Sequence, residues 1–207
     1  MARRSKSSKR WISEHESDEF VRRARESGWR SRAVYKLEEI QQKNRIIRPG
    51  MTVVDLGAAP GAWCQYVMHV MNGHGEVLAV DLLPMDPVAG VTCIQGDFRD
   101  EETLERIETE LGNRTVDLVL SDMAPNISGM AAVDQPRSMY LSELALDFAR
   151  NHLGKGGCLV VKVFQGEGFQ EFIAALRRSF ESVRTRKPAA SRSRSREVYA
   201  VARNYRL

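Results

Sequence analysis

The sequence predicts an α/β protein built on a doubly wound, mostly parallel sheet of seven strands with the last strand antiparallel. From Met51 onward, short apolar runs alternate with amphipathic stretches, which is the pattern of successive βαβ units. The last two apolar runs have no room between them for a crossover helix, so we expect these strands to pair antiparallel. The chain has 207 residues, 43% of them hydrophobic, which suits one globular domain with short extensions.

The seven strands and the helices between them follow from this alternation. We expect strands at residues 52–56, 76–81, 91–95, 116–121, 158–164, 182–186 and 197–203. We expect helices at about residues 61–71, 101–111, 136–152 and 168–180. The Ser- and Arg-rich stretch 187–196 is predicted to be a loop between the last two strands.

Two further helices are predicted before the sheet. Ser17 is a candidate N-cap for a helix over residues 18–27 that ends at Gly28. Ser31 is a candidate N-cap for a second helix that runs to about Asn44. Lys36 lies at the edge of this helix's apolar stripe, which consists of Ala33, Val34, Leu37 and Ile40.

Three regions are therefore expected along the chain. Residues 1–17 are rich in Ser, Lys and Arg and are predicted to be a flexible basic arm. Residues 18–50 are predicted to form the basic N-terminal helices that contribute Lys36, and residues 51–207 the main domain.

Basic residues are concentrated at the two ends of the chain. Residues 1–50 hold 14 Lys and Arg against seven Asp and Glu, residues 51–176 hold seven against 18, and residues 177–207 hold ten against two. Basic segments attract polyanions by neutralising phosphates, so this distribution favours a nucleic-acid partner. The alternative is that the basic ends only solubilise the chain or contact its acidic middle.

Several protein classes do not fit the sequence. No apolar run approaches the roughly 18 residues of a membrane span, and the basic start has no apolar stretch to act as a signal peptide. We therefore expect a cytoplasmic protein with no membrane partner. The three cysteines (Cys64, Cys93 and Cys158) are far apart and form no CxxC pair, which argues against a disulfide framework or a zinc site.

A Gly-rich turn follows the first predicted strand and opens a helix. Small residues there let a ligand approach the backbone, as nucleotide-binding turns of α/β sheets require. The turn lacks the GxGxxG spacing of dinucleotide enzymes, so a hydride-transfer enzyme is only a minor alternative. It resembles the first motif of class I S-adenosyl-L-methionine-dependent methyltransferases. On this resemblance the cofactor residues in this segment are Asp55, Gly57, Pro60, Gly61 and Trp63.

Aspartates also follow the next strands. Asp81 ends the second strand and is placed to accept hydrogen bonds from ribose hydroxyls. Asp97 follows the third and is placed to meet an adenine amino group, with Phe98 beside the ring. Any one of them alone can be a loop cap, but three aspartates with a Gly-rich turn predict a nucleoside cofactor at this sheet edge.

Catalytic candidates lie on the fourth and fifth strands. The segment around Asp122 lacks the aromatic residue of amino-group methyltransferases, and no cysteine lies near it to serve cytosine-C5 chemistry. Lys162 interrupts an otherwise apolar strand, where a cation is costly unless it is paired or used. Burial and a second nearby cation would favour its neutral amine, a general base for a hydroxyl nucleophile. The alternative is that Lys162 extends past the strand end into solvent.

These residues carry a resemblance to a known family. The order Lys36, Asp122, Lys162 and Glu197, with the phrases Ser-Asp-Met-Ala-Pro-Asn and Val-Lys-Val-Phe-Gln-Gly, resembles the FtsJ-like RNA ribose 2′-O-methyltransferases. The resemblance runs from about Ser27 to the end of the chain, and it is strongest to the bacterial branch that methylates a uridine ribose in large-subunit (23S) ribosomal RNA.

The resemblance implies a mechanism and a setting. The implied fold is Rossmann-like, of the class I methyltransferase type. Lys162 would accept the proton of the 2′-hydroxyl, Asp122 and Glu197 would orient Lys162, and Lys36 would assist at the ribose or a neighbouring phosphate; Asp122 would also contact the cofactor. The implied cofactor is S-adenosyl-L-methionine, with S-adenosyl-L-homocysteine as product and no metal. The implied partner is the assembled 50S subunit, at a late step of ribosome biogenesis, with the enzyme a monomer.

Eight arginines are candidates for RNA contacts on either side of the cofactor site. They are Arg22, Arg23, Arg25, Arg30 and Arg32 from the first helices, and Arg192, Arg194 and Arg196 beside Glu197. Few aromatic residues lie in these segments, so selectivity is expected from RNA shape or from an assembled subunit. Two alternatives remain open: the ribose of another RNA as substrate, or a non-catalytic ribosome-assembly factor on the same fold.

Overall fold

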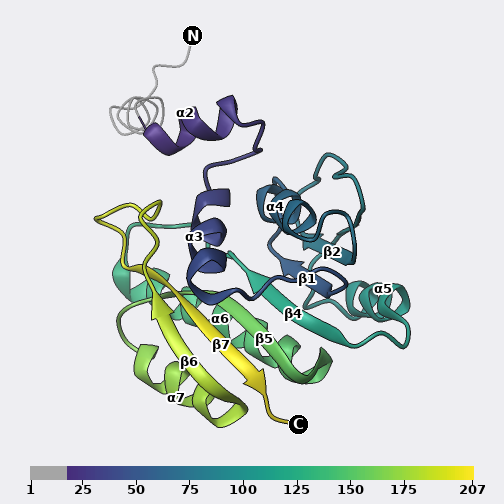
Figure 1. Ribbon diagram of the computed structural model, residues 1–207. Coiled ribbons are helices and arrows are strands. Elements are labelled where there is room, and N and C mark those ends of the chain that lie inside the picture. Colours follow the sequence, from purple (N-terminus) through teal and green to yellow (C-terminus); the bar gives the residue numbers. More distant parts are fainter. Residues whose placement is uncertain (1–17) are drawn as a thin grey trace.

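The structure is a computed structural model that describes residues 18–207. The basic arm predicted for residues 1–17 and the proposed cap Ser17 lie outside these residues. The predicted fold class is confirmed: one seven-stranded sheet has the order β3-β2-β1-β4-β5-β7-β6 (Figure 1). The pairs β2–β3, β1–β2, β1–β4 and β4–β5 are parallel, and β7 is antiparallel to both β5 and β6.

The predicted strands are all present; β6 begins two residues earlier and β7 ends two residues later than expected, and β5 is extended the most. Their bounds are β1 Thr52–Leu56, β2 Glu76–Asp81, β3 Val91–Gln95, β4 Val116–Ser121, β5 Leu153–Phe164, β6 Phe180–Arg186 and β7 Glu197–Tyr205. The prediction for β5 was wrong at its start, by five residues. The Gly-rich stretch before Cys158 suggests a loop, but Leu153 pairs with Val116 and the ladder then shifts register before Leu118 meets Cys158.

The helices after the first strand agree with prediction except at one start. Their bounds are α4 Ala62–Val70, α5 Glu101–Leu111, α6 Ala131–His152 and α7 Phe169–Ser179. We expected α6 to begin at Pro136, but it begins at Ala131 and contains that proline. The earlier start is held by Asp134, whose carboxylate accepts hydrogen bonds from the backbone N–H groups of Ser128 and Gly129, both at 2.9 Å.

The two N-terminal helices begin later than predicted. They are α2 Glu19–Glu26 and α3 Val34–Asn44. Asp18 caps α2, because its carboxylate accepts the Phe20 N–H at 3.0 Å. Ser31 is not the N-cap of α3: its hydroxyl accepts the Ala33 N–H at 3.2 Å within a separate turn that precedes the helix.

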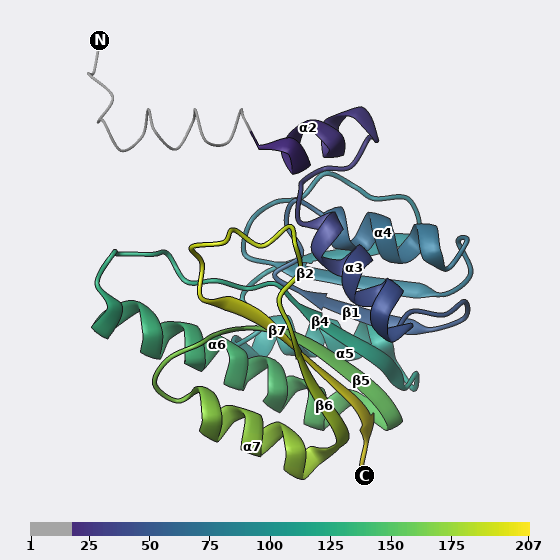
Figure 2. The ribbon, with the colours of Figure 1, turned by 60° about the vertical axis from the view of Figure 1, so that its left-hand side comes forward.

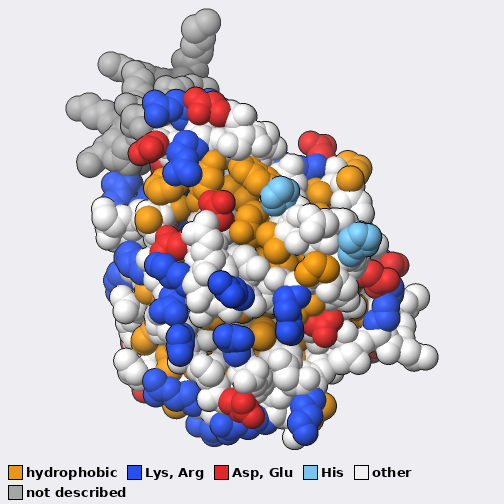
Figure 3. All heavy atoms as spheres, viewed as in Figure 1, with side chains coloured by type: hydrophobic (Ala, Val, Ile, Leu, Met, Phe, Trp, Pro, Cys, Tyr) orange, Lys and Arg blue, Asp and Glu red, His pale blue; other side chains and the backbone are white. Residues whose placement is uncertain are grey.

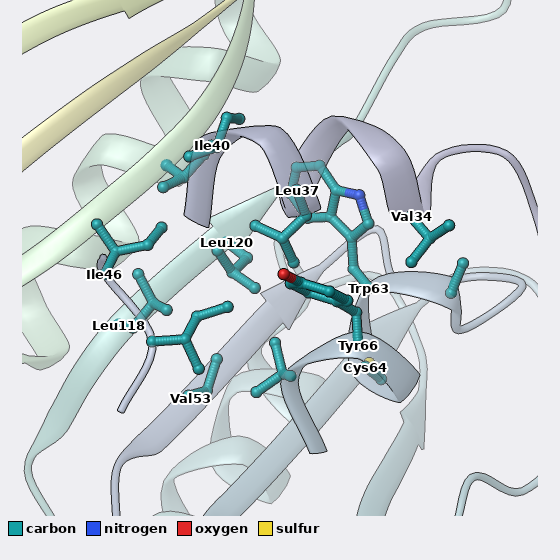
Figure 4. Packing of buried hydrophobic residues seen from close by; sticks show 14 of the residues in the cluster. Val34, Leu37, Ile40, Ile46, Val53, Trp63, Cys64, Tyr66, Leu118 and Leu120 are labelled. Atoms are coloured by element: carbon teal, nitrogen blue, oxygen red, sulfur yellow. The ribbon is translucent and has the colours of Figure 1, made fainter. Parts of the chain in front are cut away.

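Helices cover both faces of the sheet. α3 and α4 pack on one face, and α5, α6 and α7 pack on the other (Figures 1 and 2). Figure 4 shows Leu37 and Ile40 of α3 packed beside Trp63 of α4 and Leu118 and Leu120 of β4. The N-terminal helices therefore share the core of the sheet. No helix among the described residues is long and apolar enough to cross a membrane.

Candidate active site

The four predicted catalytic side chains meet at one edge of the sheet. Asp122 follows β4 and Lys162 lies near the end of β5, so both reach the carboxyl edge of these parallel strands. Glu197 reaches the same edge from the start of β7, because β7 runs antiparallel and pairs Glu197 with Phe164. Lys36 points in from α3, and its Nζ lies 3.0 Å from Glu197 Oε1.

Asp122 is the centre of this cluster. Its Oδ1 lies 3.0 Å from Lys162 Nζ and 3.9 Å from Lys36 Nζ. Lys162 Nζ also donates to the backbone carbonyl of Asp122 at 2.5 Å. Burial alone would raise the pKa of Asp122, but the charges of Lys162 and Lys36 outweigh it and hold this pKa below its ordinary value. Asp122 is thus an anion that two lysines share.

Lys162 does not extend into solvent. Its side chain is 7% exposed and is held by both Asp122 contacts. The alternative in which Lys162 reaches past the strand end is therefore wrong, because the loop after β4 carries an acceptor to the amine.

Tyr199 belongs to the site and was missed from the sequence. It is fully buried, its hydroxyl donates to Asp122 Oδ1 at 2.5 Å, and Lys36 Nζ donates to that hydroxyl at 2.9 Å. Burial and the charge of Asp122 raise the pKa of Tyr199 well above its ordinary value, so it remains a hydrogen-bond donor. The sequence did carry a signal for Tyr199: it lies two residues after Glu197, and alternate residues of a strand share a face.

A cavity at the start of α4 adjoins this cluster. It is lined by Ser31, Ala33, Asp55, Gly57, Ala58, Ala59, Pro60, Ala62, Trp63 and Asp122. Gly57 has a φ of +78°, and a Cβ there would lie 2.5 Å from the side chain of Met123. Gly61 has a φ of +99° and caps α4. The cavity is thus lined by four of the five cofactor residues predicted on the first turn (Asp55, Gly57, Pro60 and Trp63), together with Asp122, while Gly61 lies beside it as the cap of α4.

Asp55 has an unusual environment within this cavity. It is 1% exposed; Cys64 Sγ donates to its Oδ2 at 3.1 Å, and its Oδ1 has no hydrogen-bond partner in the described chain. Burial raises the pKa of Asp55 to about 7, with the charges of Asp122 and Asp81 adding to the effect. A buried, unsatisfied carboxylate oxygen beside a glycine cradle fits a ligand that brings a hydrogen-bond donor or a positive charge, as S-adenosyl-L-methionine does.

Asp81 links the Gly-rich turn after β1 to the segment that follows β2. Its Oδ2 accepts the Ala59 N–H at 2.9 Å, and its Oδ1 accepts the Leu83 N–H at 2.8 Å. The loop-cap interpretation is therefore correct for this residue, but each oxygen keeps a lone pair for a ribose hydroxyl.

Asp97 and Phe98 lie farther along the same edge and do not line the cavity. Arg99 Nε donates to Asp97 at 2.8 and 2.9 Å, and the Arg99 N–H donates at 3.1 Å. These bonds lower the pKa of Asp97. Phe98 packs partly against the core. An adenine contact at Asp97 stays a prediction, since Arg99 binds both of its oxygens in this structure.

Arg30 and Arg32, both proposed for RNA contacts, bind backbone carbonyls of the chain instead. Arg30 Nη1 donates to the carbonyls of Pro60 at 3.0 Å and Asp86 at 2.5 Å, and its Nη2 donates to that of Pro87 at 2.6 Å. Arg32 forms an ion pair with Asp18 and donates to a carbonyl of the 187–196 loop. These contacts give both residues a structural role.

The other six arginines lie in two groups. Arg22, Arg23 and Arg25 are exposed on α2, with the guanidinium of Arg23 4.6 Å from the Tyr35 ring centroid. The pKa of Arg32 is lowered mainly by burial and, as the second cause, by the positive charge of nearby Arg192. Arg194 and Arg196 are exposed in the same loop. RNA contacts by these residues stay a prediction.

Comparison with known proteins agrees with this geometry. The model of a family described as FtsJ-like methyltransferase matches residues 29–205. Among solved structures, a protein described as a ribosomal RNA methyltransferase from Plasmodium falciparum superimposes with a TM-score of 0.78. It is 28% identical in sequence, over 86% of this chain and 98% of that chain.

Proposed function

This chain belongs to the FtsJ-like methyltransferase family, and from that premise we propose that it transfers a methyl group from S-adenosyl-L-methionine to the 2′-hydroxyl of a uridine ribose in large-subunit ribosomal RNA. We further propose that it acts as a cytoplasmic monomer on the assembled 50S subunit, late in ribosome biogenesis. The observation that carries the chemistry is the buried cluster in which Lys162 and Lys36 share Asp122.

The cavity residues fit the cofactor. When bound, S-adenosyl-L-methionine supplies a methyl group on a sulfonium, which is already activated for transfer. Asp55 offers a buried carboxylate oxygen without a partner, and Gly57 leaves the backbone open to close approach. Asp81 braces the turn on which the cofactor would rest. Trp63 closes one wall, fixed by its indole N–H donating to the Ala33 carbonyl at 2.8 Å.

Proton removal from the ribose hydroxyl is the step that the cluster supports. Lys162 Nζ, as the free amine, would accept that proton, and the Asp122 carboxylate beside it would stabilise the ammonium that forms. Glu197 holds Lys36 through the 3.0 Å ion pair, which leaves Lys36 positioned toward the substrate ribose or a phosphate. Positioning of donor and acceptor should supply a large part of the rate, and the lysine about 10²–10⁴-fold.

The ribosomal substrate is supported by the basic ends of the chain and by the printed description of the Plasmodium falciparum protein. Arg192, Arg194 and Arg196 lie in the loop that leads to Glu197, where they would contact RNA next to the catalytic cluster.

The test uses S-adenosyl-L-methionine labelled on its methyl group. The purified protein is incubated separately with large ribosomal subunits, deproteinised large-subunit RNA, small subunits and transfer RNA, and any label is mapped to base or ribose. Label on a uridine 2′-oxygen of the large subunit supports the whole proposal. Label on another RNA changes the substrate, and no label with intact cofactor binding favours an assembly factor.

A further inference from the structure

The edge of the sheet carries arginines that the catalytic site does not explain. Arg184 and Arg186 on β6 pair with Val201 and Tyr199 of β7, and paired residues of neighbouring strands point to the same face. That face is the one that carries the Tyr199 hydroxyl. Arg203 lies two residues after Val201 and interacts with the thiol of Cys158, which belongs to the core under α3, so it is on this face as well.

The connection between α3 and β1 adds two more arginines to the same place. Arg45 and Arg48 are exposed there. Arg45 follows Asn44, whose side-chain oxygen accepts the Arg186 Nε–H at 3.2 Å. Burial raises the pKa of Cys158, and the charges of both Arg203 and Arg48 oppose this rise, so both arginines lie in the neighbourhood of Cys158. We call this set the β6 surface; it consists of Arg45, Arg48, Arg184, Arg186 and Arg203.

The β6 surface is open, and basic side chains predominate around it. Figures 1 and 2 show α3 over the middle of the sheet and no helix over β6 on this side. Figure 3 shows Lys and Arg side chains gathered over β6, β7 and the lower end of α3. In the described part of the chain no carboxylate forms an ion pair with any of the five arginines, whereas Arg32, Arg99 and Arg114 each form one.

Solubility alone is a weak explanation for this surface. Soluble surfaces usually mix both signs, and either sign protects an edge strand from pairing with another chain. Here unpaired arginines gather on one side of a protein whose residues 51–176 hold seven Lys and Arg against 18 Asp and Glu. Five like charges held together without counter-charges indicate a polyanionic partner.

The β6 surface is continuous with the catalytic site. Arg186 is the cross-strand neighbour of Tyr199, which hydrogen-bonds Asp122. Along β7, Tyr199, Val201 and Arg203 follow one another on this face, and the four steps from Tyr199 to Arg203 span about 13 Å at the usual rise of a strand. A strand of RNA with its ribose at Lys162 would meet these arginines within a few nucleotides.

We propose that the β6 surface binds the phosphodiester backbone of the substrate RNA beside the methylated nucleotide. This inference rests on the proposed function and adds a second contact region to the arginines of α2 and of the 187–196 loop. Guanidinium groups bind phosphates through paired N–H donors, and such contacts set the register of the RNA without reading its bases.

Two double variants test the proposal. Arg45→Gln/Arg184→Gln removes two exposed charges from the β6 surface. Arg177→Gln/Arg178→Gln removes two exposed charges from α7, on the opposite face. For each, and for the wild type, we would measure binding to deproteinised large-subunit RNA across salt concentrations and binding to assembled large subunits. We would also measure KM and kcat for RNA and the Kd of S-adenosyl-L-methionine.

The β6-surface variant should differ from the α7 variant in RNA binding alone. Loss of two phosphate contacts should reduce the slope of log K against log salt by about 1.4–1.8 and weaken binding by at least about tenfold at 0.1 M salt. KM for RNA should rise accordingly, while kcat and the cofactor Kd stay at wild-type values. The α7 variant should match the wild type throughout.

The outcomes separate this inference from the proposed function. If the wild type methylates large-subunit RNA and the two variants have equal salt slopes, the inference is overturned and the function stands. If the wild type transfers no methyl group, the function fails, and the slopes on the same RNA still decide the inference. A third outcome is that the β6-surface variant loses binding to assembled subunits but keeps the wild-type salt slope on deproteinised RNA. The β6 surface would then bind a ribosomal protein, and the inference would be overturned.

Discussion

At the scale of single residues, the site depends on how charges are shared. A lysine inside an apolar strand is costly unless its charge is matched, and Lys162 is matched by Asp122 at 3.0 Å. Asp122 in turn receives a second lysine and a buried tyrosine hydroxyl. Because Asp122 and Lys36 each have more than one partner, we expect the cluster to keep its geometry when Lys162 exchanges a proton with substrate.

Lys162→Ala should bind S-adenosyl-L-methionine like the wild type and lose methyl transfer by about 10²–10⁴-fold, because the amine that accepts the proton is removed. Calorimetry gives the cofactor Kd, and transfer of labelled methyl gives the rate. Lys155→Ala is the matched control, since Lys155 lies on the same strand and is exposed. A Lys162→Ala rate near that of this control would show that Lys162 is not the base.

Tyr199→Phe should lower kcat about tenfold with little change in cofactor affinity. The variant keeps the aromatic ring, whose centroid lies 5.7 Å from that of Trp63. Without the hydroxyl, however, Asp122 loses a hydrogen bond and Lys36 loses an acceptor. Tyr205→Phe serves as control, because the Tyr205 hydroxyl on the same strand donates to the Arg150 carbonyl. Equal kcat values for the two variants would remove Tyr199 from the functional cluster.

We predict that the contribution of Asp55 to the free energy of unfolding decreases as pH rises, the reverse of the usual behaviour of a carboxylate. Its pKa is about 7 in the folded protein against 3.8 ordinarily, so between these values the folded state binds more protons than the unfolded state. The contribution of Asp55 to the free energy of unfolding therefore falls as pH rises from about 4 to about 7, by at most about 1.4 kcal/mol per pH unit. This stabilising contribution of Asp55 is fully present below about pH 4.

The measurement is the difference in unfolding free energy between the wild type and Asp55→Asn across this pH range. Subtraction removes the other titrating groups, including Asp97 and Asp122, whose lowered pKa values act in the opposite direction. The difference should decline with rising pH. A constant difference would mean that Asp55 is ionised throughout.

At the scale of elements, the site is made by four segments that end at one edge. The carboxyl ends of β1, β2, β4 and β5, with the turns that follow them, supply the cavity, Asp81 as a brace, and the two central residues of the proposed catalytic cluster. The antiparallel β7 and the separate helix α3 add the remaining catalytic side chains from other directions. Arg30, in the connection between α2 and α3, ties the cofactor turn to the loop after β2.

Arg30→Ala should therefore weaken cofactor binding several-fold in the absence of RNA, because the carbonyls of Pro60, Asp86 and Pro87 lose a common donor. Titration calorimetry with S-adenosyl-L-methionine measures this directly. Arg25→Ala, on exposed α2, should leave the cofactor Kd unchanged. An unchanged Kd together with weaker RNA binding for Arg30→Ala would instead support the RNA contact first expected of Arg30.

At the scale of the whole molecule, the N-terminal helices and the sheet share one hydrophobic core. Leu37 of α3 is fully buried in the cluster that contains β1, β4 and α4 (Figure 4). Lys36, next to it in the chain, is thereby held over the start of β7, where it contacts Glu197 and Tyr199.

Leu37→Ala should reduce the free energy of unfolding by about 2–5 kcal/mol through the cavity it leaves, with a single unfolding transition retained. Denaturant unfolding followed by circular dichroism and by tryptophan fluorescence measures both features. Leu82→Ala, at a side chain that is 62% exposed, should have little effect. Two separate transitions would show that the N-terminal helices fold apart from the sheet.

The sequence by itself predicted the strands, most helix positions and the Gly-rich turn, and its resemblance to a known family singled out Lys36, Asp122, Lys162 and Glu197 as the proposed catalytic set. Periodicity, capping and motif spacing are local properties, and the antiparallel end of the sheet follows from the short connection before Glu197.

Only the tertiary structure decided the partners of these residues. The hydroxyl of Tyr199 meets Asp122 across 77 positions and Lys36 across 163, and Arg30 reaches Asp86 across 56. Such contacts depend on strand order, register and the direction of a helix over the sheet, and a local sequence pattern specifies none of these. For the same reason the arginines of the β6 surface, scattered between residues 45 and 203, become one surface only when the chain folds.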